Sequence, residues 1–260
     1  MKVVILCGGR GTRLREETEF RPKPMVPIGG RPILWHIMKY YAHFGHEEFI
    51  LCLGYKGDMI REYFRNYLWN TCDTTMLLGE HPSVQFHDRH DESDWSVTLA
   101  DTGEESLTAQ RVLRIRRYVR PDEPFLLTYG DGLSNIDIND TIESHKRSGK
   151  VCTVSAVHPA GRFGALRIEE DGSIHSFQEK PQLEEAYVNG GYMVCSPKLF
   201  DYLPEDRDVM LEREPMDQLV RDGQLNAYRH EGFWQPMDTY QETQYLNKVW
   251  AEGHAPWQVW

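Results

Sequence analysis

Short runs of consecutive apolar residues recur along the chain. Continuous apolar runs without alternation are typical of strands that are buried on both faces. They predict strands at Val3–Cys7, Glu48–Leu53, Phe125–Tyr129 and Cys152–Val157. From residue 160 onward the runs are shorter, and they predict strands at Ala165–Ile168, Ile174–Glu179 and Gly190–Cys195.

Between these runs, apolar residues are spaced three or four positions apart, which predicts amphipathic helices. The clearest helix covers Pro32–Phe44, and Gly45 is a typical stop after it. The same spacing predicts helices at Asp58–Leu68, Arg111–Val119, Asp140–Ser148 and Thr239–Trp250. Because strands and helices alternate, we expect an α/β layered fold with a mainly parallel sheet.

Composition narrows the possible partners. The 260 residues carry a formal net charge of −11, which disfavours nucleic acid and acidic membranes but permits a small anion in a locally basic pocket. The five cysteines are odd in number and form no Cys-x-x-Cys pair, which argues against a disulfide framework or zinc site and for a reducing compartment. No signal peptide and no apolar run of about 18–20 residues is visible, so a cytoplasmic location is expected.

The first 27 residues combine a strand, a glycine-rich loop and fixed cations. Gly8–Arg13 follows the first predicted strand, and Lys23 lies between Pro22 and Pro24. Glycines let backbone N–H groups converge on a phosphate oxygen, and prolines favour an extended, preorganised path for the lysine. The loop has Leu14 at the sixth position of Gly-x-Gly-x-x-Gly and lacks the Gly-Lys-Ser/Thr of a P-loop. We therefore expect a polyphosphate-binding site here. The alternative is a tight turn without a ligand.

Two aspartates are candidates for a metal site. Asp131 follows the predicted strand Phe125–Tyr129 and is flanked by Gly130 and Gly132. Ligands bind outside the carboxyl ends of strands in open α/β sheets, and Mg²⁺ prefers carboxylate and phosphate oxygens. Asp238 could complete such a site. The alternatives are a turn aspartate at 131 and a helix N-cap at 238.

The second half of the chain offers a further anion-binding group. Lys180 precedes Pro181 and could meet a second phosphate, while the turn Asn189–Gly191 could present donors to hydroxyl groups. An exposed lysine and a plain turn are the alternatives. His87 and His90 lie three residues apart in a polar stretch, which favours a solvated loop over a metal site.

Together these motifs resemble the sugar-1-phosphate nucleotidylyltransferases, in order and approximate spacing along nearly the whole chain. The matching motifs are Gly8–Leu14, Pro22-Lys23-Pro24, Gly130-Asp131, Glu179-Lys180-Pro181 and Met237-Asp238. Residues 32–39, 54–57, 161–166, 232–239 and 255–257 further resemble the members of this family that use CTP and glucose 1-phosphate. Thr108-Ala109-Gln110-Arg111 departs from the usual Thr-Gly-Gly-Arg of the family, which leaves the path of this loop around the nucleotide open.

The resemblance implies a Rossmann-like mixed, mostly parallel sheet flanked by helices, with a small β appendage and a C-terminal helical segment. It implies one domain over 1–260: a nucleotide-binding core at 1–157, a sugar-phosphate part at 158–239, and a packing or oligomer segment at 240–260. Members of the family are homo-oligomers, and those that use CTP and glucose 1-phosphate form hexamers.

The resemblance also implies roles for single residues. Arg13, Lys23, Asp131 and Lys180 would be catalytic, and Asp131 and Asp238 would bind Mg²⁺. Lys180 would contact the sugar phosphate, with Glu179, Asn189, Gly190 and Gly191 beside the sugar. The implied nucleotide contacts are Leu6, Gly8, Gly9, Arg10, Gly11, Thr12, Arg13, Lys23, Ser106, Arg111 and Gly130.

The expected reaction is the transfer of a cytidylyl group from CTP to α-D-glucose 1-phosphate, which gives CDP-glucose, a precursor of dideoxyhexoses in bacterial surface polysaccharides such as O-antigen. The same chemistry with UTP or dTTP, or with another sugar phosphate, is the nearest alternative. A non-catalytic nucleotide-sugar sensor is more remote, because a sensor need not keep metal ligands and phosphate clamps together. A nicotinamide-dependent oxidoreductase is disfavoured by the failed glycine pattern.

Overall fold

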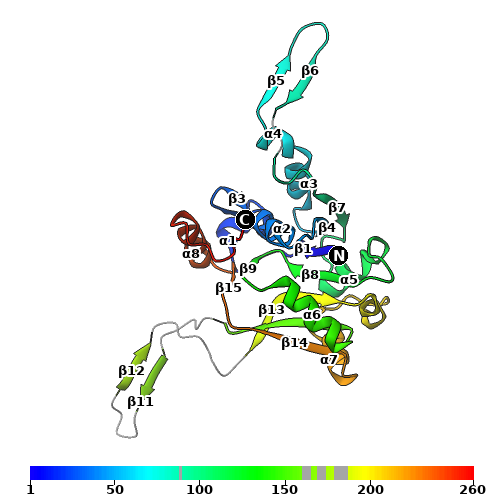
Figure 1. Ribbon diagram of the computed structural model, residues 1–260, viewed down its shortest axis with the longest axis vertical. Coiled ribbons are helices and arrows are strands. Elements are labelled where there is room, and N and C mark those ends of the chain that lie inside the picture. Colours follow the sequence, from blue (N-terminus) through cyan, green and yellow to red (C-terminus); the bar gives the residue numbers. More distant parts are fainter. Residues whose placement is uncertain (88–89, 160–164, 169–173, 179–186) are drawn as a thin grey trace.

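A seven-stranded sheet forms the centre of the computed structural model, with strand order β14-β10-β13-β8-β1-β4-β7 (Figure 1). The structure describes residues 1–260 except 88–89, 160–164, 169–173 and 179–186. The strands of this sheet are β1 (Val3–Leu6), β4 (Glu48–Leu53), β7 (Ser96–Asp101), β8 (Phe125–Tyr129), β10 (Cys152–Val157), β13 (Val188–Cys195) and β14 (Leu225–His230). All neighbouring pairs are parallel except the two that β13 makes with β8 and β10. This mixed, mostly parallel sheet confirms the expected fold class.

Helices cover both faces of the sheet. Successive residues of a strand point to opposite faces, so the apolar residues of each strand contribute to two separate cores. Val3 and Ile5 belong to one core cluster, with α2 (Ile33–His43), α6 (Ile138–Ser148) and α8 (Tyr240–Ala251). Val4 and Leu6 belong to the other, with α5 (Thr108–Arg114) and α7 (Glu214–Arg221). The remaining helices are α1 (Arg15–Thr18), α3 (Gly57–Arg65) and α4 (Tyr67–Thr71), and the 3₁₀ turns are η1 (Lys23–Met25), η2 (Arg116–Tyr118) and η3 (Pro197–Tyr202). None of the helices in the described residues is long and apolar enough to cross a bilayer.

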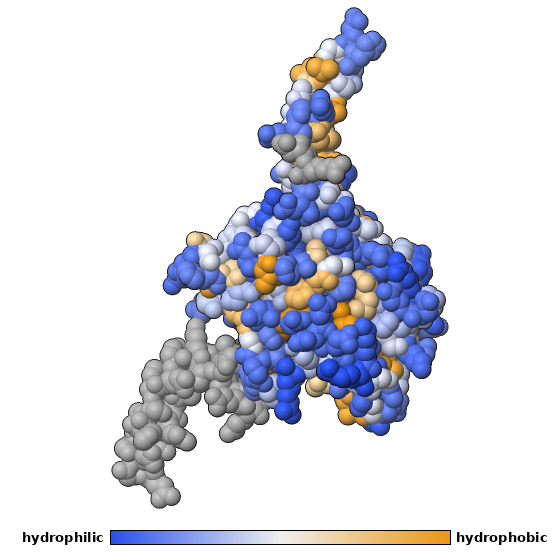
Figure 2. Space-filling view, in the orientation of Figure 1, coloured by the Kyte–Doolittle hydropathy of each residue, from blue (hydrophilic) through white to orange (hydrophobic). Residues whose placement is uncertain are grey.

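Four two-stranded ribbons complete the described structure: β2 (Pro27–Ile28) with β3 (Arg31–Pro32), β5 (Thr74–Leu77) with β6 (Ser83–Phe86), β9 (Gly132–Ser134) with β15 (Trp234–Pro236), and β11 (Ala165–Ile168) with β12 (Ile174–Gln178). The β5–β6 ribbon projects from the body and exposes apolar side chains, among them Met76, Leu77 and Val84 (Figures 1 and 2).

The long apolar patterns gave accurate elements, and the exceptions have local causes. β4, β8 and β10 coincide with the predicted strands. The helix predicted at 58–68 is wrong in its length: Asn66 leaves helical geometry (φ −97°, ψ 16°) and separates α3 from α4, consistent with the low helix propensity of asparagine. The helix predicted at 111–119 begins earlier, at Thr108, and continues as the 3₁₀ turn η2. β7 and β14 were not predicted, because edge strands are only partly buried and lack continuous apolar runs.

The C-terminal tryptophans pack around a buried histidine on α2. Trp250, Trp257 and Trp260 all lie in ring contact with His36. The Nε2–H group of His36 donates to the Ile28 carbonyl (2.8 Å), and Trp257 Nε1–H donates to His36 Nδ1 (3.3 Å). These partners require a neutral ring, and burial lowers the pKa of His36 to about 4. The C-terminal segment is therefore bound to α2 and to the β2–β3 ribbon.

This histidine makes stability dependent on pH. The unfolded chain binds a proton near pH 6.5 whereas the folded chain resists it down to about pH 4, so stability is full above pH 6.5 and is lost as the pH falls through this window. We expect His36→Phe to remove up to about 1.4 kcal/mol per pH unit from the slope of unfolding free energy near pH 5. Urea unfolding at several pH values measures this slope. His46, whose pKa burial also lowers to about 4, should retain its own share, and an unchanged slope in the variant would contradict the assignment to His36.

Candidate functional site

The glycine-rich loop leaves the sheet where its strand order reverses. From β1 the chain passes to β4 on one side, and β8 lies on the other. The Gly130 N–H donates to the Leu6 carbonyl (3.0 Å), which joins the ends of β8 and β1. Such a switch point at the carboxyl ends of parallel strands is where open α/β sheets bind ligands.

Arg111 gives this loop its shape. Its guanidinium is buried and donates to the carbonyls of Gly8 (2.9 Å), Leu53 (3.2 Å) and Gly103 (2.8 Å), and to Thr102 Oγ1 (3.0 Å). A methyl group at Gly8 would overlap the guanidinium. The structure thus places Arg111 at the wall of the site with donors engaged by the backbone, and burial lowers the pKa of its side chain.

Lys23 reaches the site from η1. The expectation of an extended backbone there was wrong, because Lys23 begins a 3₁₀ turn: the Met25 N–H donates to the Pro22 carbonyl (2.8 Å). Pro22 itself is extended (φ −67°, ψ 147°), and Pro24 is tolerated in the first turn because its missing N–H is not needed there. The side chain of Lys23 is buried up to its ammonium group.

Asp131 and Asp238 are placed side by side by the β9–β15 ribbon. Gly132 pairs with Pro236, and the Met237 N–H donates to the Asp131 carbonyl (2.8 Å). The alternative assignment of Asp238 as a helix N-cap is wrong, because Thr239 is the N-cap of α8. In this capping box, Glu242 Oε2 accepts hydrogen bonds from the N–H groups of both Asp238 and Thr239 (2.7 Å each). The carboxylate of Asp238 is therefore directed into the site while α8 begins behind it.

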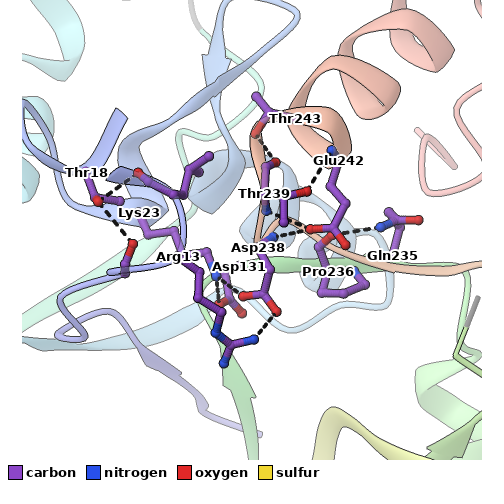
Figure 3. Close-up of polar contacts among 12 residues, drawn as sticks. Arg13, Thr18, Lys23, Asp131, Gln235, Pro236, Asp238, Thr239, Glu242 and Thr243 are labelled. Carbon is purple, nitrogen blue, oxygen red and sulfur yellow. Dashed lines mark hydrogen bonds and ion pairs between the residues drawn. The ribbon is translucent and has the colours of Figure 1, made fainter. Parts of the chain in front are cut away.

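Lys23 bridges the two carboxylates (Figure 3). Its Nζ lies 2.7 Å from Asp131 Oδ2 and 2.6 Å from Asp238 Oδ1, and Arg13 donates to Asp238 Oδ2 (2.7 Å). Burial lowers the pKa of Lys23, but the two carboxylates outweigh it, and the pKa is raised overall. The ammonium group thus stays charged at neutral pH.

The two carboxylates fit a hard divalent cation. A cationic ammonium already lies between Asp131 and Asp238, so both carboxylates are oriented toward a single positive charge. Among the described residues no group of three or more His, Cys, Asp or Glu side chains is arranged to hold a metal. Mg²⁺ is commonly bound by one or two carboxylates together with substrate phosphates, so this pair suits it.

These groups surround a cavity of about 300 Å³. Its wall includes most of the predicted nucleotide contacts: Leu6, Gly8, Gly9, Gly11, Thr12, Arg13, Lys23, Ser106, Arg111 and Gly130. Arg10 is not in this wall but forms an exposed ion pair with Glu105. Cys7 also lines the cavity, and burial raises the pKa of its thiol, which disfavours the reactive thiolate form.

A second, smaller cavity of about 50 Å³ adjoins the first, and Tyr129 and Asp131 line both. The predicted sugar contacts Asn189, Gly190 and Gly191 line the smaller one, where Trp234 Nε1–H donates to the Gly190 carbonyl (2.7 Å). Glu179 and Lys180 lie outside the described residues. A larger open groove of about 690 Å³ lies elsewhere, between η3 and α7, and contains neither the loop nor the carboxylates.

The unusual Ala109-Gln110 pair is accommodated by the segment 204–213. Ala109 is buried, and its N–H donates to the Val209 carbonyl (3.2 Å). The Gln110 side chain donates to the carbonyls of Pro204 (3.1 Å) and Arg207 (3.2 Å). Sequence reasoning missed the contributions of Thr108, Tyr129, Met210 and Trp234 to the two cavities. Thr108, Tyr129 and Trp234 each lie in a motif that the sequence analysis noted, whereas Met210 carried no such signal.

Comparisons with known proteins agree with this geometry. The sequence matches the family described as "Nucleotidyl transferase" over residues 2–246. It is 50% identical over 260 residues to the glucose-1-phosphate cytidylyltransferase of Salmonella typhi, and 47% identical over 262 residues to the probable glucose-1-phosphate cytidylyltransferase of Bacillus subtilis (strain 168); both alignments cover 100% of each chain. The fold is similar to that of HddC from Yersinia pseudotuberculosis (TM-score 0.68, 23% identity, covering 96% of this chain and 99% of the other).

Gly8 and Gly9 offer a matched pair of substitutions. A Cβ atom at Gly8 would overlap Arg111, whereas one at Gly9 has no atom within 4 Å. We expect Gly8→Ala to lower the free energy of unfolding by about 1–3 kcal/mol, because the guanidinium must move from its backbone partners. Gly9→Ala should change it by less than about 0.5 kcal/mol. Urea unfolding without ligands measures both, and equal effects would contradict the close approach at Gly8.

Proposed function

This chain belongs to the nucleotidyl transferase family, and on that premise we propose that it is a glucose-1-phosphate cytidylyltransferase, which transfers a cytidylyl group from CTP to α-D-glucose 1-phosphate. The observation that carries the proposal is the cluster of Arg13, Lys23, Asp131 and Asp238 between the glycine loop and the cavity at Asn189–Gly191. It brings cations and metal-binding oxygens to the point where two anionic substrates would meet.

The reaction needs positioning and charge compensation rather than a general base. A phosphate oxygen of the sugar phosphate forms a bond to the α-phosphorus, the bond from that phosphorus to the bridging oxygen breaks, and pyrophosphate leaves with the electron pair. The attacking oxygen is already anionic, so no proton must be removed. The glycine loop and Arg13 would hold the departing pyrophosphate, because the loop N–H groups and the guanidinium are donors for phosphate oxygens.

The proposed role of Lys23 differs from that of Arg13. Its ammonium is held by two carboxylates in a buried position, whereas the Arg13 side chain is 68% exposed and could exchange its one ion pair, with Asp238, for a phosphate. Asp131 and Asp238 would hold Mg²⁺, which supplies charge compensation at the phosphates when it is bound. Lys180, outside the described residues, would contact the phosphate of glucose 1-phosphate, as its Glu-Lys-Pro motif implies.

The wider context follows from the same proposal. CTP is a cytoplasmic metabolite, so we propose that the protein acts in the cytoplasm and supplies a nucleotide sugar for surface polysaccharides. The homo-oligomer implied by the resemblance, a hexamer, is compatible with the exposed apolar side chains on the β5–β6 ribbon.

A nucleotide panel tests the proposed activity. With glucose 1-phosphate and Mg²⁺, we expect pyrophosphate release with CTP at a kcat/KM at least tenfold above that with UTP, dTTP, ATP or GTP, and CDP-glucose as the product by mass spectrometry. A preference for UTP or dTTP would replace the cytidylyl assignment with a related transfer. Binding of CDP-glucose without turnover of any nucleotide would support the sensor instead.

The metal assignment has its own test. We expect Asp131→Asn to lower kcat by at least about 100-fold in saturating Mg²⁺, since it removes charge from the group that faces the phosphates. Lys23 keeps Asp238 as a partner, so the circular dichroism spectrum and melting temperature should change little. Asp201→Asn is the control, because Asp201 is exposed on η3 and its ion pair with Arg116 is long (4.0 Å). Near-normal turnover of Asp131→Asn would refute this role.

A further inference from the structure

We propose that Glu212 is a positioning residue for the transfer: its carboxylate joins the wall of the nucleotide cavity to Tyr129, the side chain between the two cavities. The inference rests on the proposed function and goes beyond the residues that the family motifs contain. Glu212 does not line either cavity, so it would act through its partners rather than on a substrate.

Tyr129 is the first partner. Its hydroxyl donates to Glu212 Oε1, and its ring occupies the space that a side chain at position 191 would need. Gly191 adopts φ +80°, a left-handed conformation that favours glycine, so both the backbone and the ring require glycine there. Because Tyr129 lines both cavities and is followed by Gly130-Asp131, its ring orientation defines the boundary between the nucleotide and the sugar phosphate.

Thr108 is the second partner, in the wall of the nucleotide cavity. Its Oγ1 donates to Glu212 Oε2 (2.7 Å) and accepts from the Leu211 N–H (2.8 Å). Thr108 begins α5 and lines the nucleotide cavity beside Ser106 and Met210. Both carboxylate oxygens of Glu212 are thus engaged, one by Tyr129 and one by Thr108.

Neighbouring contacts hold Glu212 in this bridging position. The Leu107 N–H donates to both carboxylate oxygens of Asp208 (2.9 and 3.0 Å), and the Ala109 N–H donates to the Val209 carbonyl (3.2 Å). The segment 208–212 is therefore fastened along the first turn of α5, and Met210 in its middle faces the nucleotide cavity. A shift of Thr108 would therefore be transmitted through Glu212 to Tyr129, and the reverse.

Such coupling matters for an in-line transfer, because a misplacement of about 1 Å between two bound reactants can cost a large factor in rate. The carboxylate fixes the nucleotide wall relative to Tyr129, which lies two residues before Asp131. Positioning by Glu212 therefore predicts that a substitution in the wall of the nucleotide cavity also weakens the binding of the sugar phosphate.

The test is a set of variants measured for KM of both substrates, kcat and melting temperature. We expect Thr108→Val, which touches only the nucleotide cavity, to raise KM for glucose 1-phosphate as well as for CTP by about fivefold. Tyr129→Phe should raise both KM values in the same way. The double variant Thr108→Val/Tyr129→Phe should have KM values no higher than those of the more affected single variant, and Glu212→Ala should resemble the double variant. Thr108→Ser keeps the hydroxyl and should restore both KM values.

Glu214→Gln is the matched control, because Glu214 lies two residues away, is exposed and pairs only with Arg207 in the described contacts (2.6 Å); both of its KM values should stay native. Additive effects of Thr108→Val and Tyr129→Phe, or a Thr108→Val variant with a native KM for glucose 1-phosphate, would overturn the proposal even if Glu212→Ala failed to fold. CDP-glucose formation by the native enzyme in the same assay tests the proposed function separately.

Discussion

The ammonium group of Lys23 between Asp131 and Asp238 is the interaction on which the site depends. Without it, two carboxylates would face one another at the edge of a partly buried cavity, and removing one member of a buried ion pair typically costs several kcal/mol. The bridge connects three distant parts of the chain: the turn after the glycine loop, the end of β8 and the start of α8. The site is therefore complete only when these three parts of the chain are in place together.

The C-terminal helix has a corresponding double role. Its capping box orients the backbone at Asp238, and its other end holds Trp250 against Gly29 and His36. Asn247 adds hydrogen bonds to the Pro27 carbonyl (3.2 Å) and the Gly29 N–H (3.0 Å). The C-terminal tryptophans thus anchor a helix whose N-cap, Thr239, directly follows Asp238.

The sequence predicted those parts of the molecule that depend on local patterns. The buried strands followed from continuous apolar runs, and the glycine loop and Asp131 followed from their place at strand ends. The edge strand β7 could not be found this way, because one of its sides has no neighbour to bury it. Nor could the contacts of Glu212, which joins Thr108 and Tyr129 from 104 and 83 residues away. The number of possible long-range partners for one polar residue is too large for spacing alone to select among them.

The two arginines near the glycine loop show why residue type alone does not define a role. Arg111 is buried and donates to the Gly8, Leu53 and Gly103 carbonyls, so its guanidinium stabilises the conformation of the loop. Arg13 is mostly exposed, and its ion pair with Asp238 lies at the cavity wall, where an anionic ligand can compete for the guanidinium. Exposed ion pairs contribute about 0–1 kcal/mol, so exchanging this partner for a phosphate costs little. Although the chain has a net charge of −11, Arg13, Lys23 and Arg111 lie together around one cavity, and of these the mostly exposed Arg13 is the one whose partner can be exchanged for an anionic ligand.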